Sequence, residues 1–196
     1  MHQTSVFGRG ATFSSLKSLP GLQYAADFIT PEEEGALIAA IEAQPLREAQ
    51  YRQYTARRRT VSYGAGYDYS MQRPTPAPPV PDFLHGVVGK AAAWAAVAPE
   101  DFVQALVAEY HPGTPLGWHR DVPSYELIFG LSLAGIGRLR FRPYPWRPEL
   151  RKEIVEVAVE PRSAYILSGD ARWQWQHHVP PAKVLRYSVT LRTQRR

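Results

Sequence analysis

The chain has 196 residues, of which 44% are apolar and 21% charged, a composition that fits one globular domain with a substantial core. It contains no cysteine, which excludes disulfides, thiolate metal sites and cysteine nucleophiles, so any metal must be held by histidine and carboxylate. No apolar run reaches the ~18 residues that span a bilayer, and residues 1–19 lack an apolar signal core. We therefore expect a cytoplasmic protein that does not bind membranes. The formal charge of +5 suits an anionic partner such as nucleic acid.

Residues 1–20 are polar and rich in glycine and serine, which indicates a flexible arm before a single domain of residues 21–196. The first helix is predicted to begin at Thr30-Pro31. Threonine is a good N-cap, proline suits the first helical position, and the three glutamates that follow favour the positive end of the helix. A second helix is predicted from Pro81 to about Val97.

Between the two helices, residues 50–80 mix arginines with tyrosines. The set comprises Arg52, Arg57, Arg58, Arg59, Tyr51, Tyr54, Tyr63, Tyr67 and Tyr69. In a loop, such residues can hold phosphates while the rings stack on bases. The alternative interpretation is a solvated hairpin whose tyrosines pack on a sheet. Considered alone, the segment favours the hairpin.

From Phe102 onward, short β-rich runs follow one another, separated by glycine and proline turns. They cover Phe102–Tyr110, Glu126–Leu133, Arg138–Arg142, Glu153–Val159, Ala164–Ser168 and Arg186–Arg192. Many short strands without intervening helices are typical of a sandwich or barrel. The pattern predicts an α+β chain in which two helices precede an all-β core.

His119 and Asp121 are candidate metal ligands, because residues i and i+2 of an extended chain point to the same side. A distal histidine at His177 would complete two imidazoles and one carboxylate, a set that leaves three positions open on non-haem iron. The neighbouring His178 is a rival. On a strand the two histidines would point to opposite faces, so only one of them should bind metal.

The C-terminal strand alternates polar and apolar residues, with Arg186, Ser188, Thr190 and Arg192 on one face. Cationic groups on the inner face of a barrel need an anion, since a buried unpaired charge is costly. We expect Arg186 to bind the far carboxylate of a dicarboxylate in a bidentate pair, with Arg192 nearer the metal. The alternative is a pair of surface arginines on an edge strand.

These features together resemble the AlkB family of Fe(II)- and 2-oxoglutarate-dependent dioxygenases, over nearly the whole chain from about residue 21 to 193. The motifs are Tyr110-x-Pro-Gly-x-x-x-Gly-Trp-His-x-Asp121, Arg172-Trp-x-Trp-x-His177 and Arg186-Tyr-Ser-x-Thr-x-Arg192. The resemblance implies a double-stranded β-helix, or jelly-roll, core with two N-terminal supporting helices and a nucleotide-recognition lid at about residues 50–80. It therefore shifts the interpretation of that segment from a plain hairpin to a lid.

The resemblance also implies the site and the reaction. Iron would be held by His119, Asp121 and His177, and 2-oxoglutarate by Tyr110, Arg186, Ser188 and Arg192. With O2, the cosubstrate would yield succinate and CO2 while an N-alkyl group is hydroxylated and released as an aldehyde. The target base would be flipped into a pocket. The residues expected to contact the substrate are Trp118, Glu126, Arg57, Arg58, Arg59, Tyr63, Tyr67 and Tyr69.

Three positions depart from the family pattern. Ala108 replaces an asparagine that contacts the cosubstrate, and His178 replaces a glycine after the distal histidine. Pro123 replaces an acid that reads the base edge in nucleic-acid repair members, and Glu126 is the nearest acid. The predicted function is thus oxidative dealkylation of N-alkylated or etheno-bridged bases in DNA or RNA by a monomer. A protein or peptide oxygenase on the same fold is the alternative.

Overall fold

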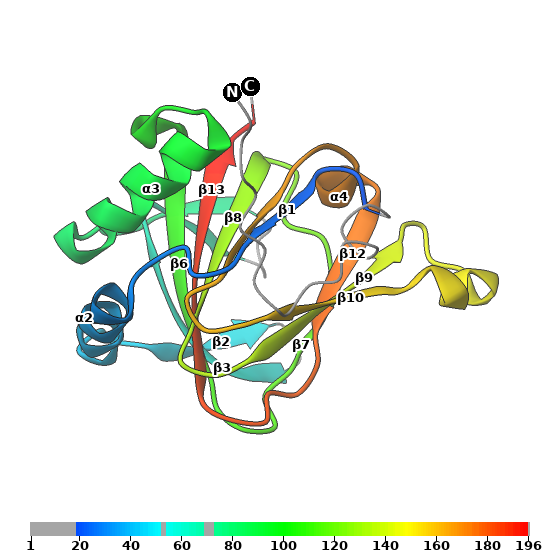
Figure 1. Ribbon diagram of the computed structural model, residues 1–196, viewed down its shortest axis with the longest axis horizontal. Coiled ribbons are helices and arrows are strands. Elements are labelled where there is room, and N and C mark those ends of the chain that lie inside the picture. Colours follow the sequence, from blue (N-terminus) through cyan, green and yellow to red (C-terminus); the bar gives the residue numbers. More distant parts are fainter. Residues whose placement is uncertain (1–18, 52–53, 69–72, 196) are drawn as a thin grey trace.

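The core of the fold is formed by two antiparallel β-sheets packed face to face (Figure 1). The computed structural model describes residues 19–51, 54–68 and 73–195. Within these ranges the larger sheet has the strand order β1-β11-β8-β13-β6-β3-β2. Its strands are β1 (Leu22–Ala25), β11 (Ala164–Leu167), β8 (Tyr125–Leu133), β13 (Arg186–Gln194), β6 (Phe102–Tyr110), β3 (Tyr54–Tyr63) and β2 (Arg47–Tyr51).

The smaller sheet, in the order β10-β9-β12-β7, faces the larger one. Its strands are β10 (Val155–Val159), β9 (Gly137–Pro143), β12 (Trp175–Val179) and β7 (Leu116–His119). Phe141 and Val157 from this sheet share a core with Ile128 and Leu167 from the larger one. Two facing antiparallel sheets of this kind make the predicted jelly roll.

Helices α2 (Pro31–Glu42) and α3 (His85–Ala95) lie along the outer face of the larger sheet (Figure 1). Thr30 caps α2 as predicted, because its hydroxyl accepts from the Glu33 amide and the Glu33 carboxylate accepts from the Thr30 amide. Phe28, Trp94 and Phe129 form a ring cluster, with centroid distances of 5.3 to 6.2 Å, that ties α3 to the sheet. The predicted supporting helices are therefore present.

The segment expected to be a loop-like lid is largely β-structured. Residues 50–80 contribute to β2 and β3 at the edge of the larger sheet and form the separate hairpin of β4 (Ala65–Asp68) and β5 (Arg73–Pro76). The register pairs Arg59 with Glu109 and Tyr63 with Ala105 on β6. The hairpin alternative was therefore correct for the backbone of this segment.

Several predicted bounds need correction. Leu19, expected in a flexible arm, is fully buried in the core between the sheets, while residues 1–18 lie outside the described part. The second helix begins as a 3-10 turn, η1 (Asp82–Leu84), and Glu153 belongs to the 3-10 segment η3 (Pro148–Glu153). A further 3-10 turn, η2 (Pro99–Asp101), precedes β6, and the short helix α4 (Gly169–Trp173) follows β11, where only a turn was expected. None of the helices in the described ranges is long and apolar enough to cross a membrane.

Strand β13 is central, hydrogen-bonded to β6 on one side and β8 on the other. The edge-strand alternative for its arginines is therefore wrong. Tyr187, Val189 and Leu191 face helices α2 and α3 and belong to the apolar core between those helices and the larger sheet. Arg186, Ser188 and Arg192 are buried on the opposite side, toward the smaller sheet.

Candidate active site

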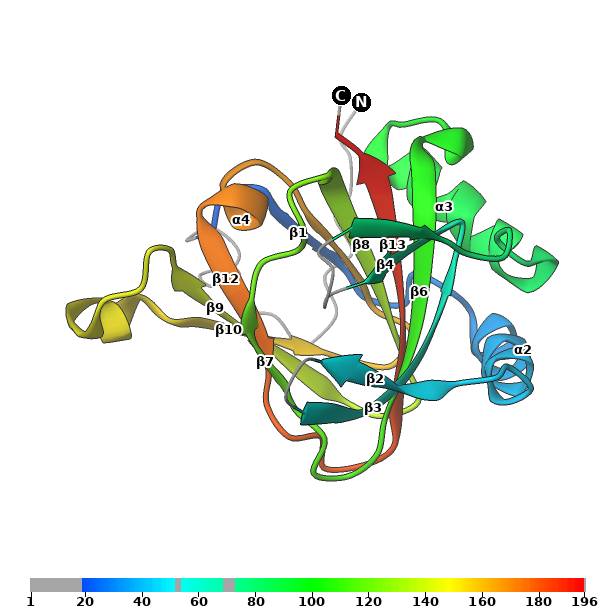
Figure 2. The same cartoon turned by 180° about the vertical axis from the view of Figure 1, so that it is seen from behind.

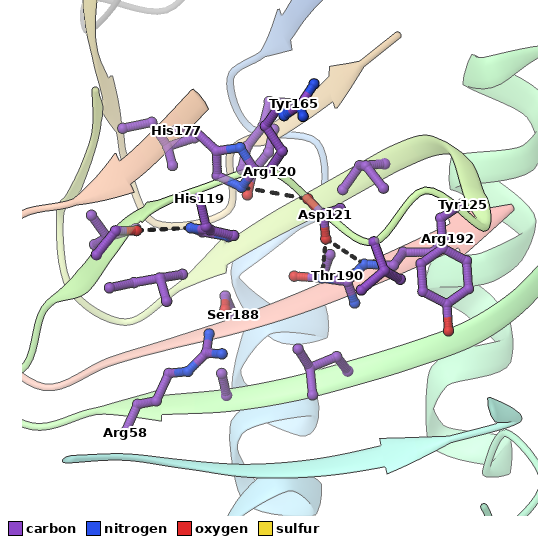
Figure 3. A pocket seen from close by; sticks show the side chains of 18 of the residues that line it. Arg58, His119, Arg120, Asp121, Tyr125, Tyr165, His177, Ser188, Thr190 and Arg192 are labelled. Atoms are coloured by element: carbon purple, nitrogen blue, oxygen red, sulfur yellow. Dashed lines mark hydrogen bonds and ion pairs between the residues drawn. The ribbon is translucent and has the colours of Figure 1, made fainter. Parts of the chain in front are cut away.

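Three predicted metal ligands converge between the sheets (Figure 3). One ligand atom from each of His119, Asp121 and His177 lies within 4.8 Å of the others. His177 pairs with His119 across β12 and β7, so both imidazoles point to the inner face, and their ring centroids are 4.1 Å apart. His178 points outward and stacks on Trp118 at 4.9 Å. Of the two neighbouring histidines, only His177 is therefore placed to bind a metal with His119 and Asp121.

Neighbouring groups orient two of the three ligands, His119 and Asp121. The Nδ1 atom of His119 lies 2.8 Å from the Gly117 carbonyl, a contact that leaves Nε2 for a metal. Asp121 accepts two hydrogen bonds from Arg192 on Oδ1, at 2.6 and 2.7 Å. Its buried Oδ2 has no hydrogen-bond partner among the described residues and lies 3.5 Å from His177 Nε2. An open carboxylate oxygen between two imidazoles fits a divalent cation such as Fe(II).

The electrostatics of the three residues also suit a metal. Burial lowers the pKa of His119, and burial together with the neighbouring His119 lowers the pKa of His177 to about 3. Burial alone would raise the pKa of Asp121, but the charge of Arg192 and the two histidines hold it below its usual range. At neutral pH the site therefore presents two neutral imidazoles and one carboxylate, which are the metal-binding forms.

At the other end of β13, Arg186 is 98% buried and lies in the same cavity as Tyr110 and Ser188. Its Nε donates to Ser132 Oγ at 3.0 Å, and its guanidinium carbon is 5.3 Å from the centroid of the Tyr110 ring. Burial would raise the pKa of Tyr110, but the charges of Arg58 and Arg186 lower it. This end of the cavity has the donors that a carboxylate requires.

Arg172 connects the metal site to helix α4. Its Nη2 donates to the carbonyls of Asp121, Val122 and Tyr125, at 3.2, 2.8 and 2.8 Å. The side chain is buried, and its guanidinium carbon lies 4.2 Å from the ring centroid of Trp173. A cation that donates to three carbonyls between residues 121 and 125 restricts the loop that carries Asp121. The sequence motif included Arg172, but its role was not foreseen.

The three consecutive arginines in the middle of β3 point in different directions. Arg57 is exposed, whereas Arg58 is buried and points into the cavity toward Ser188 and His119 (Figure 3). Arg59 turns to the opposite face, where it pairs with Glu109 at 3.1 Å and donates to the Leu46 carbonyl. Because strand residues alternate between faces, only one of the two neighbours can reach the site. The expected substrate contact of Arg59 is therefore corrected.

Two further substrate predictions need correction. Tyr63 is buried on the helical face of the larger sheet, where its hydroxyl donates to Gln44 at 2.7 Å. Glu126 is exposed outside the cavity, accepts from the Trp173 indole and lies 3.8 Å from Arg195. Pro123 does line the cavity, so no acid occupies that position. Tyr67 lies in β4 and Tyr69 outside the described residues, and their roles stay predictions.

The cavity measures about 530 Å³, enough for 2-oxoglutarate and a flat heterocycle. Gln104 and Tyr165 are among the lining residues that were not predicted. Gln104 accepts from Arg192 at 2.9 Å, and the Tyr165 ring lies over Gly130, where a Cβ atom would collide with it. Burial raises the pKa of Tyr165 to about 12. Gln104 and Tyr110 share a face of β6, so alternation along that strand would have placed Gln104 here.

Known proteins with similar sequences fit this geometry. The family model of the 2OG-Fe(II) oxygenase superfamily matches residues 21–195. The "Alkylated DNA repair protein ALKBH8 homolog" of Arabidopsis thaliana is 29% identical in an alignment 188 residues long that covers 85% of this chain and 53% of that protein. The "Uncharacterized protein L905" of Acanthamoeba polyphaga mimivirus is 31% identical, with 85% of this chain and 76% of that protein covered. The chain thus spans about half the length of the Arabidopsis relative.

A solved structure, "The structure of OsALKBH1", matches with a TM-score of 0.72 over 89% of this chain and 97% of that one, at 15% identity, which supports the shared fold. The chain belongs to the 2OG-Fe(II) oxygenase superfamily, and the relatives that carry a descriptive name are of the AlkB type. It is a dioxygenase, and the cofactors of its family are Fe(II), 2-oxoglutarate and O2.

Proposed function

We propose that this enzyme oxidatively removes N-linked alkyl groups from bases in nucleic acid. His119, Asp121 and His177 would hold Fe(II), and Arg186 with Tyr110 would hold the far carboxylate of 2-oxoglutarate. Bound iron and 2-oxoglutarate supply the oxidising chemistry, which consumes O2 and releases succinate and CO2. The base then leaves with one alkyl group fewer, after loss of an aldehyde.

The residues of the chain position the reactants in this proposal. Arg192 fixes the carboxylate of Asp121 through two hydrogen bonds, so that Oδ2 stays directed toward the histidines. Arg172 holds the loop behind Asp121. Tyr165, Leu139 and Ile128 form an apolar part of the cavity wall.

The positive charge of the cavity is the observation that supports a nucleic-acid substrate. Four guanidinium groups and one carboxylate line the cavity within the described residues, namely Arg58, Arg120, Arg186, Arg192 and Asp121. Iron adds two positive charges, and 2-oxoglutarate removes only two. A surplus of positive charge next to the reacting centre favours an anionic substrate, and the phosphates of a nucleotide provide it. The Arabidopsis relative is named as an alkylated-DNA repair protein.

The test is turnover on defined substrates. Purified protein with Fe(II), ascorbate and 2-oxoglutarate is given oligonucleotides with N-methyl or etheno bases, in DNA and in RNA, and succinate and aldehyde are measured. We expect equal amounts of both products, which depend on the modified base and are lost in the His177→Ala variant. Product release that is unaffected by every oligonucleotide but stimulated by methylated peptides would replace the proposal with the peptide-oxygenase alternative.

A further inference from the structure

The outer face of the smaller sheet carries a layered set of rings and guanidinium groups. His177 pairs with His119 and with Phe141, and these three residues face the cavity or the core. Their neighbours along the strands therefore project from the opposite face. The outward residues near the end of the sheet are Trp118 on β7, His178 on β12 and Arg142 on β9.

These three side chains form a stack that Trp146 extends. The Trp118 ring lies 4.9 Å from the His178 ring at an interplanar angle of 25°. The Arg142 guanidinium carbon is 4.5 Å from the centroid of Trp118 and 5.0 Å from that of Trp146, and Arg142 Nε donates to Gln176 at 2.8 Å. Arg142 is thus held between two indoles with one nitrogen bound, so little freedom is left to lose when an anion binds.

Charge pairing distinguishes Arg142 from its neighbours on the same strand face. Arg138 and Arg140 share the carboxylate of Glu156, each at 3.4 Å. Among the described residues, no carboxylate lies within ion-pair distance of Arg142. A half-buried, oriented cation without a counter-ion is stabilised by an external anion, and its planar fork suits phosphate.

A second arginine connects this face to the cavity. Arg120 lines the cavity, stacks on the Tyr144 ring at 3.7 Å and donates to the Trp173 carbonyl at 3.1 Å. Within the described ranges it also lacks a carboxylate partner. Trp118 likewise lines the cavity and belongs to the stack. The surface therefore runs without interruption from the mouth of the cavity to Trp146 near the tip of β9, on the arm that β9, η3 and β10 form in Figure 2.

We propose that this surface, the flank platform of Trp118, Arg120, Arg142, Tyr144 and Trp146, binds the nucleotides next to the target base in single-stranded nucleic acid. Phosphates and flat bases alternate along a single strand, as guanidinium groups and rings do here. In a duplex the base faces are stacked inside and cannot reach the rings. The inference rests on the proposed function, since it assigns the part of the substrate that lies outside the cavity.

Binding of an unmodified strand tests the flank platform. Fluorescein-labelled oligothymidylate of twelve nucleotides is titrated with the full chain and followed by anisotropy at several salt concentrations. Arg142→Gln should weaken binding about three- to tenfold and reduce the slope of log affinity against log salt by about 0.7. Trp146→Ala should weaken it by roughly 5- to 100-fold, through lost stacking. The matched control is Arg138→Gln, which removes the same charge from the same face of β9.

The affinities of the three variants either support or reject the flank platform. Weaker binding by the Arg142 and Trp146 variants, with Arg138→Gln like the parent and all melting temperatures unchanged, supports the platform. Equal binding by the Arg142 and Arg138 variants overturns it, as does a parent that prefers a duplex or polyglutamate to the single strand. The proposed function is tested separately by turnover on alkylated bases. If the parent demethylates an oligonucleotide and Arg142→Gln does not change oligonucleotide affinity, the proposed function stands and the flank platform is rejected.

Discussion

The inner wall and the rim of the cavity differ in how their side chains are fixed. On the inner wall, Asp121, Arg186 and Arg192 are buried, and each binds a neighbour on an adjacent strand or loop. At the rim, Arg120 is exposed and stacks on Tyr144, and the nearby Arg142 stacks on Trp118; among the described residues neither pairs with a carboxylate. The side chains of the inner wall are fixed in one arrangement, which suits a metal and cosubstrate site. The arginines of the rim can bind different anionic groups.

The largest contrast should come from the two adjacent histidines. His177→Ala removes an inner-wall ligand, so we expect loss of iron binding and turnover well beyond the ~10–100-fold typical of residues that only support a ligand. His178→Ala removes a ring of the outer stack and should leave iron-dependent succinate formation largely intact. Iron affinity measured by calorimetry compares the two. Loss of metal binding in His178→Ala with retention in His177→Ala would reverse the assignment.

Arg186 tests the anion end of the wall. Removal of its buried charge leaves a carboxylate of 2-oxoglutarate desolvated and unpaired, at a cost of about 3–5 kcal/mol. Arg186→Ala should therefore raise the apparent KM for 2-oxoglutarate by roughly two to three orders of magnitude or more, and Arg186→Lys by less, because lysine keeps the charge but not the fork. Iron affinity is the internal control. Unchanged cosubstrate dependence in both variants would move the anion site to Arg192.

Arg172 joins wall and rim, since it binds the backbone behind Asp121 and packs on Trp173. Arg172→Met keeps most of the side-chain volume and removes the donors, so we expect iron affinity to fall about 10–100-fold. The KM for 2-oxoglutarate, measured at saturating iron, should change little. A melting curve separates this effect from general unfolding. If iron affinity is unaffected at full folding, the loop holds its position without Arg172.

The smallest expected effects are changes in the KM for an oligonucleotide when arginines on the two faces of β3 are replaced. Arg58→Gln removes a cation from the cavity and should raise the KM for an oligonucleotide substrate about tenfold, the order expected for one phosphate contact. Arg59→Gln changes a residue paired with Glu109 on the other face and should leave that KM within twofold of the parent. The measurement is KM at constant salt, with 2-oxoglutarate saturating. A larger effect from Arg59 would restore the original three-arginine prediction.

Alternation along single strands predicted the residues of the inner wall correctly but misplaced residues of the 50–80 segment, as β3 shows. The run Phe102–Tyr110 was predicted with the bounds of β6, and alternation along 186–192 placed Arg186 and Arg192 on the inner face. Each of those inferences needs only the period of a single strand. Tyr63 and Arg59 were misplaced because their segment was treated as a loop, in which no alternation applies. Its pairing with β6 depends on residues 42 to 50 positions further along the chain, from Tyr63↔Ala105 to Arg59↔Glu109, which the local pattern does not contain.

The contact between Gly130 and Tyr165 has an evolutionary consequence. A side chain at position 130 would occupy the space of the Tyr165 ring, so the ring, which lines the cavity, would have to move. The two positions should therefore vary together among related enzymes, with a larger residue at 130 matched by a smaller one at 165. Such an exchange would alter the room beside the cosubstrate without any change in metal or anion ligands. New substrate preferences could then arise from this pair of positions while the chemistry of the site is conserved.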